Sequence, residues 1–184
     1  MKRAVAGLCL GMLVLWGPLS EGLEALEQSG VFQFRWKPDK EFQMLDYNVK
    51  SSEPEAKNKL LLKMEPLSGK VDALRVSIPE AFHDNNGKIY ADTILIKLDC
   101  SRPAGQLSKT TCASELPVEV VISEDLAFIS ILPERLIDPE ENVAIELELV
   151  NPEIGIFQFN AFVREAGGSL HDYQGSWLFD VNPM

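Results

Sequence analysis

Apolar and polar residues alternate along most of this 184-residue chain, a pattern typical of strands that bury one face. The clearest case is VAIELELV at residues 143–150, where aliphatic residues occupy the odd positions and Glu146 and Glu148 stand between them. The same alternation predicts strands at residues 31–36, 60–64, 73–78, 94–98, 118–122, 127–131, 143–150, 155–164 and 176–181.

Turn signals such as HDNNG, SED and DPEEN separate these segments, and almost no helical pattern is present. About nine short strands with one apolar face each predict an all-β fold, an antiparallel two-sheet sandwich. Residues 37–59 are polar and contain Pro38 and Pro54, which favours a long surface connection with room for one edge strand. The expected organisation is an N-terminal segment and connection at 23–56 and a sandwich domain at 57–184, which strand 31–36 joins.

The stretch NPEIGIFQFNAFVREAGGSLHDYQGSWLFDV, residues 151–181, reads as an aromatic-rich hairpin broken at Gly167 and Gly168. We expect its odd positions to form a wall of the core, because the expected register sets a large residue opposite a smaller one at each level of that face. The expected register places three pairs opposite each other: Val163 with Trp177, Ala161 with Phe179, and Phe159 with Val181.

The other face of this hairpin is polar at Asn160, Arg164, Ser176 and Asp180, but it also carries Ile156, Phe162 and Leu178. The expected register pairs Phe162 directly with Leu178. An apolar cluster on a face that is otherwise polar and solvent-exposed suggests an interaction patch for a partner. The alternative is that the connection at 37–59 folds back and covers the cluster.

The N-terminus has the features of a signal peptide. Lys2 and Arg3 precede an uncharged run at residues 4–16, and the small residues Ser20 and Gly22 stand before an expected cleavage point after residue 22. The run is shorter than the roughly 20 apolar residues that span a bilayer, which disfavours a retained membrane anchor. We therefore expect a signal peptide at 1–22 and a secreted or periplasmic protein, with the cell surface and the thylakoid lumen also open. No membrane insertion is expected after cleavage.

Acidic residues outnumber basic ones by 28 to 17, for a net charge of -11. This excess repels phosphate backbones and anionic membranes, so nucleic acid is excluded as a partner. After removal of Cys9 with the signal peptide, Cys100 and Cys112 remain, on either side of a loop-like stretch. In an oxidising compartment they are expected to form a disulfide, with two free thiols or a metal half-site as the alternatives.

The search for chemistry is mostly negative. His83 and His171 stand in no metal-ligand spacing and near no nucleophile motif, although HDYQ places His171 beside Asp172 and Tyr173. Adjacent residues of an extended segment point in opposite directions, so a surface loop is favoured there over a proton relay. DNNGK at residues 84–88 resembles a calcium loop in composition but fits a tight turn better. The acids of residues 134–141 fit a solvated loop, with a weak divalent-cation site as the alternative. No catalytic, cofactor-binding or metal-ligating residue is assigned, and no cofactor is expected.

The hairpin also resembles the C-terminal half of an uncharacterised secreted β-sandwich domain family found mainly in cyanobacteria. The residues that carry the resemblance are Asn151, Pro152, Gly155, Phe157, Phe159, Ala161, Phe162, Tyr173, Gly175 and Phe179. Upstream, LLLKMEPLSGKVDALRVSIPEAF is similar to the first strand pair of that family, so the resemblance covers roughly residues 57–181. It implies fold and location, and it supplies no catalytic residue.

Two functions remain open. The first is a non-catalytic extracytoplasmic module, structural or binding an unknown protein or envelope component. The alternative is a periplasmic hydrolase with paired carboxylates, which needs little motif and could escape notice in so acidic a chain. The first is favoured because no reaction centre is recognisable.

Overall fold

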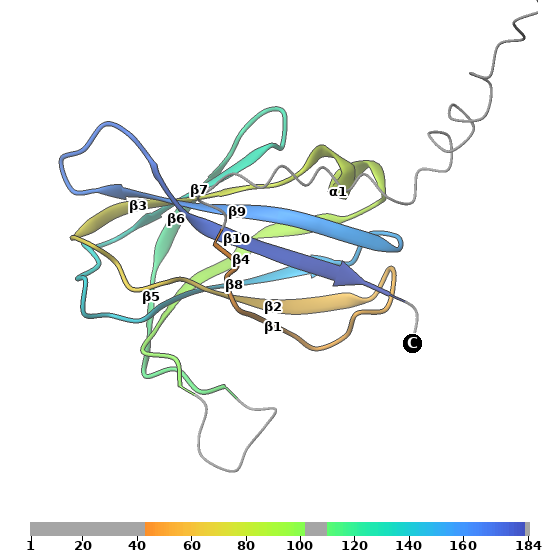
Figure 1. Ribbon diagram of the computed structural model, residues 1–184, viewed down its shortest axis with the longest axis horizontal. Coiled ribbons are helices and arrows are strands. Elements are labelled where there is room, and N and C mark those ends of the chain that lie inside the picture. The colour runs from red at the N-terminus through yellow and green to blue at the C-terminus, as the bar shows by residue number, and fades with distance from the viewer. Residues whose placement is uncertain (1–42, 102–109, 183–184) are drawn as a thin grey trace, which may run out of the picture. The chain divides into compact units, whose positions relative to one another are not determined.

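The computed structural model describes residues 43–101 and 110–182, which form an all-β, two-sheet antiparallel sandwich as predicted (Figure 1). The expected signal peptide at 1–22 and the expected strand at 31–36 lie outside the described residues. Ten strands and one short helix are described.

The first sheet, called sheet I here, has the strand order β1-β2-β8-β4-β5. Its strands are β1 (Tyr47–Val49), β2 (Lys57–Lys63), β8 (Val143–Val150), β4 (Lys88–Leu98) and β5 (Ser114–Leu116). Every pairing is antiparallel, and β8 at the centre pairs with β2 on one side and β4 on the other.

The second sheet, sheet II, has the order β10-β9-β3-β7-β6. Its strands are β10 (Asp172–Val181), β9 (Gly155–Glu165), β3 (Val71–Ser77), β7 (Phe128–Pro133) and β6 (Val118–Ile122). These pairings are also antiparallel. The single turn of helix α1 (Glu80–Asp84) follows β3 and buries one residue, Phe82.

The predicted strands from residue 60 onward are confirmed, and several are longer than expected. The predicted polar connection contains one edge strand, β1. Two further elements, β5 and α1, were not predicted from the sequence. Each has five residues or fewer, too short for a hydrophobic period to be recognised.

The core lies between the sheets and is built from the inward positions of the alternating strands. Its largest fully buried side chains are Trp177, Phe82, Phe159, Phe179, Leu60, Leu62, Leu74, Ile96, Leu98, Ile129, Ile131 and Ile137. The indole nitrogen of Trp177, on sheet II, donates a hydrogen bond of 2.9 Å to the carbonyl oxygen of Lys63 at the end of β2. The largest side chain of the core therefore also joins the two sheets.

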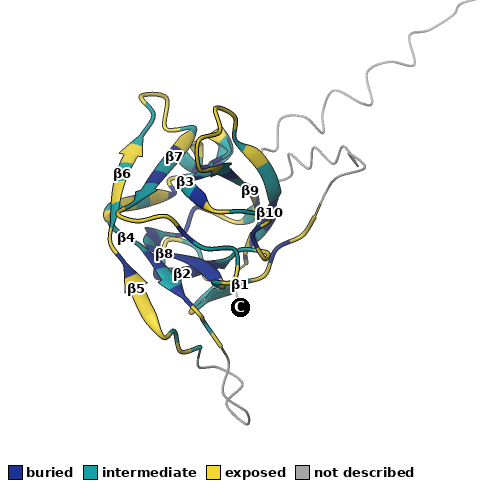
Figure 2. Cartoon of the chain, turned by 90° about the vertical axis from the view of Figure 1, so that its left-hand side faces the viewer, coloured by how far each residue is buried: buried dark blue, intermediate teal, exposed yellow. Residues whose placement is uncertain are grey.

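On each lateral side of the sandwich, one segment of the chain links the two sheets. Figure 2 shows β5 and β6 along one side and β1 and β10 along the other. On the first side the chain passes from sheet I to sheet II at Pro117, between β5 and β6. On the second side Leu45 N donates to Ser176 O of β10 at 2.8 Å, and β1 then pairs with β2. Strands that change sheets in this way close the corners of a sandwich.

The register of the β9–β10 hairpin differs from the prediction. Trp177 pairs with Phe159 instead of Val163, and Phe179 pairs with Phe157 instead of Ala161. The strands turn about Gly167 and Gly168, because Asp172 pairs with Val163, so the turn lies earlier in the chain than the predicted register requires. A bulge between Tyr173 and Gly175 then shifts the ladder by one residue. Beyond the bulge the net displacement is an even number of residues, so the odd positions there still face the core as predicted.

Candidate functional site

The outer face of sheet I is a network of opposite charges. Lys57 Nζ lies 3.1 Å from Glu148 Oε2, and Lys59 Nζ lies 3.1 Å from Glu146 Oε1. Lys97 bridges Glu146, at 3.4 Å, and Glu115. The hydrogen bond from Lys97 also lowers the pKa of the Glu115 carboxyl. These strand-borne carboxylates are thus engaged by lysines, in contrast to the two unequal carboxyls that the hydrolase alternative requires.

The outer face of sheet II carries, around Asn160, a group of uncharged polar side chains that are bonded to one another. Asn160 Nδ2 donates to Ser77 Oγ at 2.8 Å, and Ser176 Oγ donates to Asn160 Oδ1 at 2.7 Å. Tyr173 Oη and Ser176 Oγ are 2.7 Å apart, and Gln158 Nε2 donates to Asn160 Oδ1 at 2.7 Å. The network spans β10, β9 and β3 and fixes this part of the face.

The three residues of the predicted interaction patch all lie on this outer face, but they do not form one cluster. Leu178 pairs with Gln158. Ile156, which is 42% exposed, lies two residues before Gln158 on β9 and pairs with Asp180. Phe162 pairs with Tyr173, on the far side of the polar network. The predicted direct pairing of Phe162 with Leu178 is therefore wrong, because the strands turn earlier than the predicted register requires.

Phe162 belongs to an aromatic group around an arginine. Its ring lies 5.8 Å from that of Tyr173, edge to face, and its neighbour across the ladder on β3 is Arg75. The guanidinium carbon of Arg75 lies 5.6 Å from the ring centre of Phe128 on β7. Among the described residues, Arg75 forms no ion pair, and its buried Nε has no hydrogen-bond partner. The sequence did not single out Arg75, since an arginine inside an apolar strand only indicates a solvent-facing position.

His171 lies near this group. Burial lowers the pKa of its imidazole, and the nearby charges of Arg75 and Arg164 lower it further. Arg164 is itself paired with Asp72, at 2.6 Å from Nε to Oδ1. The hydroxyl of Tyr173 is engaged by Ser176, so the structure does not bring the HDYQ residues together as a relay.

The alternative to a partner was that the polar connection at 37–59 folds back and covers the patch. Of this connection the structure describes residues 43–59. Residues 43–45 run along the edge of β10, where Ser176 N donates to Gln43 O at 2.7 Å and Met44 forms a parallel bridge with Ser176. The ring of Tyr47 then packs against Phe179 of the core in a T-shaped arrangement, with 6.1 Å between the ring centres. This segment closes the side of the sandwich and does not lie across the outer face of sheet II.

Cys100 and Cys112 form a disulfide in the structure, with Sγ atoms 2.07 Å apart. Beside it, Ser101 and Thr111 exchange two backbone hydrogen bonds, of 2.8 and 2.9 Å. The pair therefore closes the loop that follows β4 at its base.

The remaining sequence motifs serve as local structure. The DNNGK stretch is the turn after α1, where Asn86 has a φ of 66° and its side chain donates to Glu153 at 3.1 Å. In the acidic loop, Arg135 pairs with Glu141 at 2.6 Å and Lys70 with Asp138 at 2.9 Å. Across residues 43–101 and 110–182, no three His, Cys, Asp or Glu side chains are grouped to hold a metal ion. The same residues contain no helix long and apolar enough to cross a membrane.

Residues 31–181 match the DUF2808 family of proteins of unknown function, so the chain belongs to that family. The expected relation to an uncharacterised domain family is thereby confirmed, and the match begins at residue 31 instead of 57. A search of curated proteins returns no match.

Several solved structures are similar in fold. The collagen-binding domain of a Staphylococcus aureus adhesin is 11% identical with a TM-score of 0.41, over 76% of this chain and 97% of that one. The C-terminal domain of the Streptococcus pyogenes antigen I/II-family protein AspA is 8% identical with a TM-score of 0.43, over 74% and 46%. A putative membrane anchored protein from Corynebacterium diphtheriae is 12% identical with a TM-score of 0.42, over 80% and 38%. Likeness at this level carries no functional argument.

Proposed function

We propose that this member of the DUF2808 family is an exported, non-catalytic binding module that contacts a protein or another envelope component through the outer face of sheet II. One observation carries the proposal, namely the difference between the two outer faces. Sheet I presents lysines and glutamates that neutralise one another, as a solvated face does. Sheet II presents exposed Ile156 and Phe128 and an arginine without an ion pair among the described residues.

This composition suits a contact surface. Burial of apolar and aromatic side chains against a partner lowers the free energy of the complex, because it removes them from water. Arginine and aromatic residues are both enriched at the centres of interfaces. The polar network of Asn160, Ser176 and Ser77 is already bonded internally, so a partner can cover it at little desolvation cost.

Position-specific crosslinking in the native host tests the proposal. A photo-reactive benzoylphenylalanine in place of Gln158, which is exposed beside Leu178, should give a discrete crosslinked product. The matched control places the same group at Lys57, exposed on the outer face of sheet I, where no such product is expected. Identical products from both positions, or none from Gln158, would contradict the proposed surface.

Export is supported by the signal-like residues 1–22 and by the Cys100–Cys112 disulfide, because disulfides persist in oxidising compartments. Protein isolated from the native host should begin near Leu23 and show no alkylatable thiol at Cys100 or Cys112 before reduction. An intact Met1, or two free thiols in the native protein, would rule out this part of the proposal.

A further inference from the structure

A hollow of about 300 Å³ opens at the side of the sandwich, away from the face discussed above. Its lining includes Ile78, His83, Lys88, Ile89, Ile122 and Ile129. The volume is at the lower end of the range for small-molecule sites, and most of the lining is apolar, as in such sites.

The strand pairing explains why the hollow exists. β5 pairs with β4 only at residues 96–98, so the first part of β4 has no partner on that side within the described chain. The strand across the gap, β6, is the edge strand of sheet II. The hollow thus lies between one strand edge from each sheet. Natural proteins usually cover or blunt such edges, and a bound molecule is one way to cover them.

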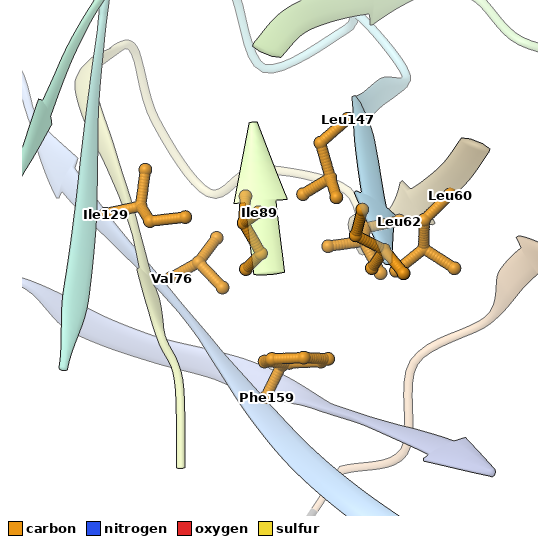
Figure 3. Close-up of a pocket in the computed structure, with 8 residues that line it drawn as sticks. Leu60, Leu62, Val76, Ile89, Ile129, Leu147 and Phe159 are labelled. Carbon is orange, nitrogen blue, oxygen red and sulfur yellow. The ribbon is translucent and has the colours of Figure 1, made fainter. Parts of the chain in front are cut away.

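The inner wall of the hollow is formed by residues that also face the core. Ile89 and Ile129 line the hollow and also line a separate void of about 10 Å³ between the sheets. Figure 3 shows this void, into which side chains of both sheets point, among them Phe159 and Leu147. Its lining is entirely apolar, so water gains no hydrogen bond there. The inner wall of the hollow, which includes Ile89, Ile129 and Ile122, is likewise apolar and favours an apolar group.

The outer end carries positive charge. Lys88 is exposed at the start of β4 and forms no ion pair with a described residue, in a chain where acids outnumber bases. His83 also lines the hollow, with Nδ1 3.3 Å from Gly87 O and a buried Nε2 that has no hydrogen-bond partner among the described residues. Gly87, which precedes Lys88, packs closely against α1, because a Cβ at this position would lie 2.5 Å from Phe82 O.

From this arrangement we infer a second binding site, for a small anionic amphiphile. The apolar body would pack against Ile78, Ile89, Ile122 and Ile129, and the acidic group would face Lys88 at the outer end. Such an acid could be a flexible acyl chain or a flat aromatic acid, and both share this chemistry. The inference does not depend on the proposed contact surface, which lies on a different face.

Fluorescence titration of the full chain with anilinonaphthalene sulfonate, an anionic apolar dye, tests the inference. We expect saturable binding that decanoate or 2-naphthoate displaces, and the stronger competitor identifies an acyl or an aromatic ligand. Ile122→Trp should fill the hollow and abolish binding, whereas Val121→Trp, on the outward face of the same strand, should leave it intact. Displacement by neither acid, or equal binding to the two variants, would overturn the site.

A charge reversal tests the acidic group separately and does not depend on a core substitution that could disturb folding. Lys88→Glu should weaken binding of the anionic dye by about fivefold, as expected for an exposed ion pair replaced by repulsion. Binding of the neutral dye N-phenyl-1-naphthylamine should stay unchanged. Lys50→Glu, at another exposed lysine, is the matched control. Equal loss for both dyes, or equal effects of Lys50→Glu and Lys88→Glu, would contradict the assigned role of Lys88.

Discussion

Gly175 lies so close to Leu45 that a Cβ built on it would be 2.7 Å from Leu45 Cγ, and its φ of +143° is one that residues with a side chain rarely adopt. The glycine sits beside the bulge of β10, at the point where residues 43–45 join its edge. The absence of a side chain at 175 therefore lets the N-terminal segment close this side of the sandwich.

Gly175→Ala should lower the free energy of unfolding by about 2–4 kcal/mol, because backbone strain adds to a collision with Leu45. Gly167→Ala is the matched control, since Gly167 also has a positive φ, +82°, but has nothing within 4 Å of the added Cβ. Gly167→Ala should lower the free energy of unfolding by the backbone strain alone, about 1 kcal/mol. Chemical denaturation of both variants measures the difference, and equal losses would show that the contact with Leu45 does not matter.

Phe179 tests the core wall of the hairpin. Its ring is fully buried and lies 6.1 Å from Tyr47 and 6.3 Å from Phe159. Phe179→Ala should cost about 3–5 kcal/mol of stability, from lost burial and the cavity that remains. Val121→Ala, on the exposed face of β6, should change stability by about 0.5 kcal/mol at most. Urea denaturation measures both, and a loss below about 1 kcal/mol for Phe179→Ala would argue against this packing.

Asn151 is a buried polar junction. Its Nδ2 donates to Glu53 O at 2.6 Å and to Ser51 O at 3.2 Å, and its Oδ1 accepts from Asn58 Nδ2 at 2.8 Å. Asn151→Ala should cost about 2–4 kcal/mol, because it leaves several buried partners without a hydrogen bond. Asn182→Ala, which removes an exposed bond to Asp180, should cost about 0.5 kcal/mol or less. Similar thermal midpoints for the two variants would show that the buried hydrogen bonds of Asn151 do not stabilise the fold.

His171 predicts a pH dependence. Burial, with Arg75 and Arg164 nearby, lowers its pKa in the folded state, while Asp72 and Asp172 oppose the shift. As the pH falls below the ordinary histidine pKa of about 6.5, the unfolded chain takes up the proton first and is stabilised. The contribution of His171 to stability is therefore complete at neutral pH and is lost as the pH falls toward the lowered value.

The measurement compares wild type with His171→Gln by denaturation at several pH values between 7.5 and 5. The wild type should lose more stability across this range than the variant. A constant difference between the two proteins would show that protonation of His171 is not disfavoured in the fold.

Much of the fold could be predicted from the sequence because burial of one face imposes alternation. In β8 the inward aliphatic residues and outward Glu146 and Glu148 define both the strand and its faces. Short elements escape this reasoning, since β5 offers three residues and α1 offers one buried side chain. The hairpin register failed for a different reason, because alternation within each strand fixes neither the position of the turn, which is centred on Gly167 and Gly168, nor the one-residue bulge near Gly175.

The candidate surface could be predicted only in part. Ile156, Phe162 and Leu178 were assigned to the correct face by alternation, but their neighbours depend on register and on other strands. Arg75 meets Phe162 from β9 and Phe128 from β7, and nothing in its own strand indicates these contacts. The hollow beside β4 is also a property of two sheet edges, which a pattern along one strand does not reveal.

The most direct test of the proposed contact surface combines crosslinking with a change that should spare the fold. Ile156→Ser together with Leu178→Ser removes apolar surface from the outer face of sheet II, beside the crosslinking position Gln158. The stability of this variant should stay within about 1 kcal/mol of the wild type, because neither side chain is part of the core. The account predicts that the product crosslinked from position 158 disappears in this stably folded variant. An undiminished crosslinked product would contradict it.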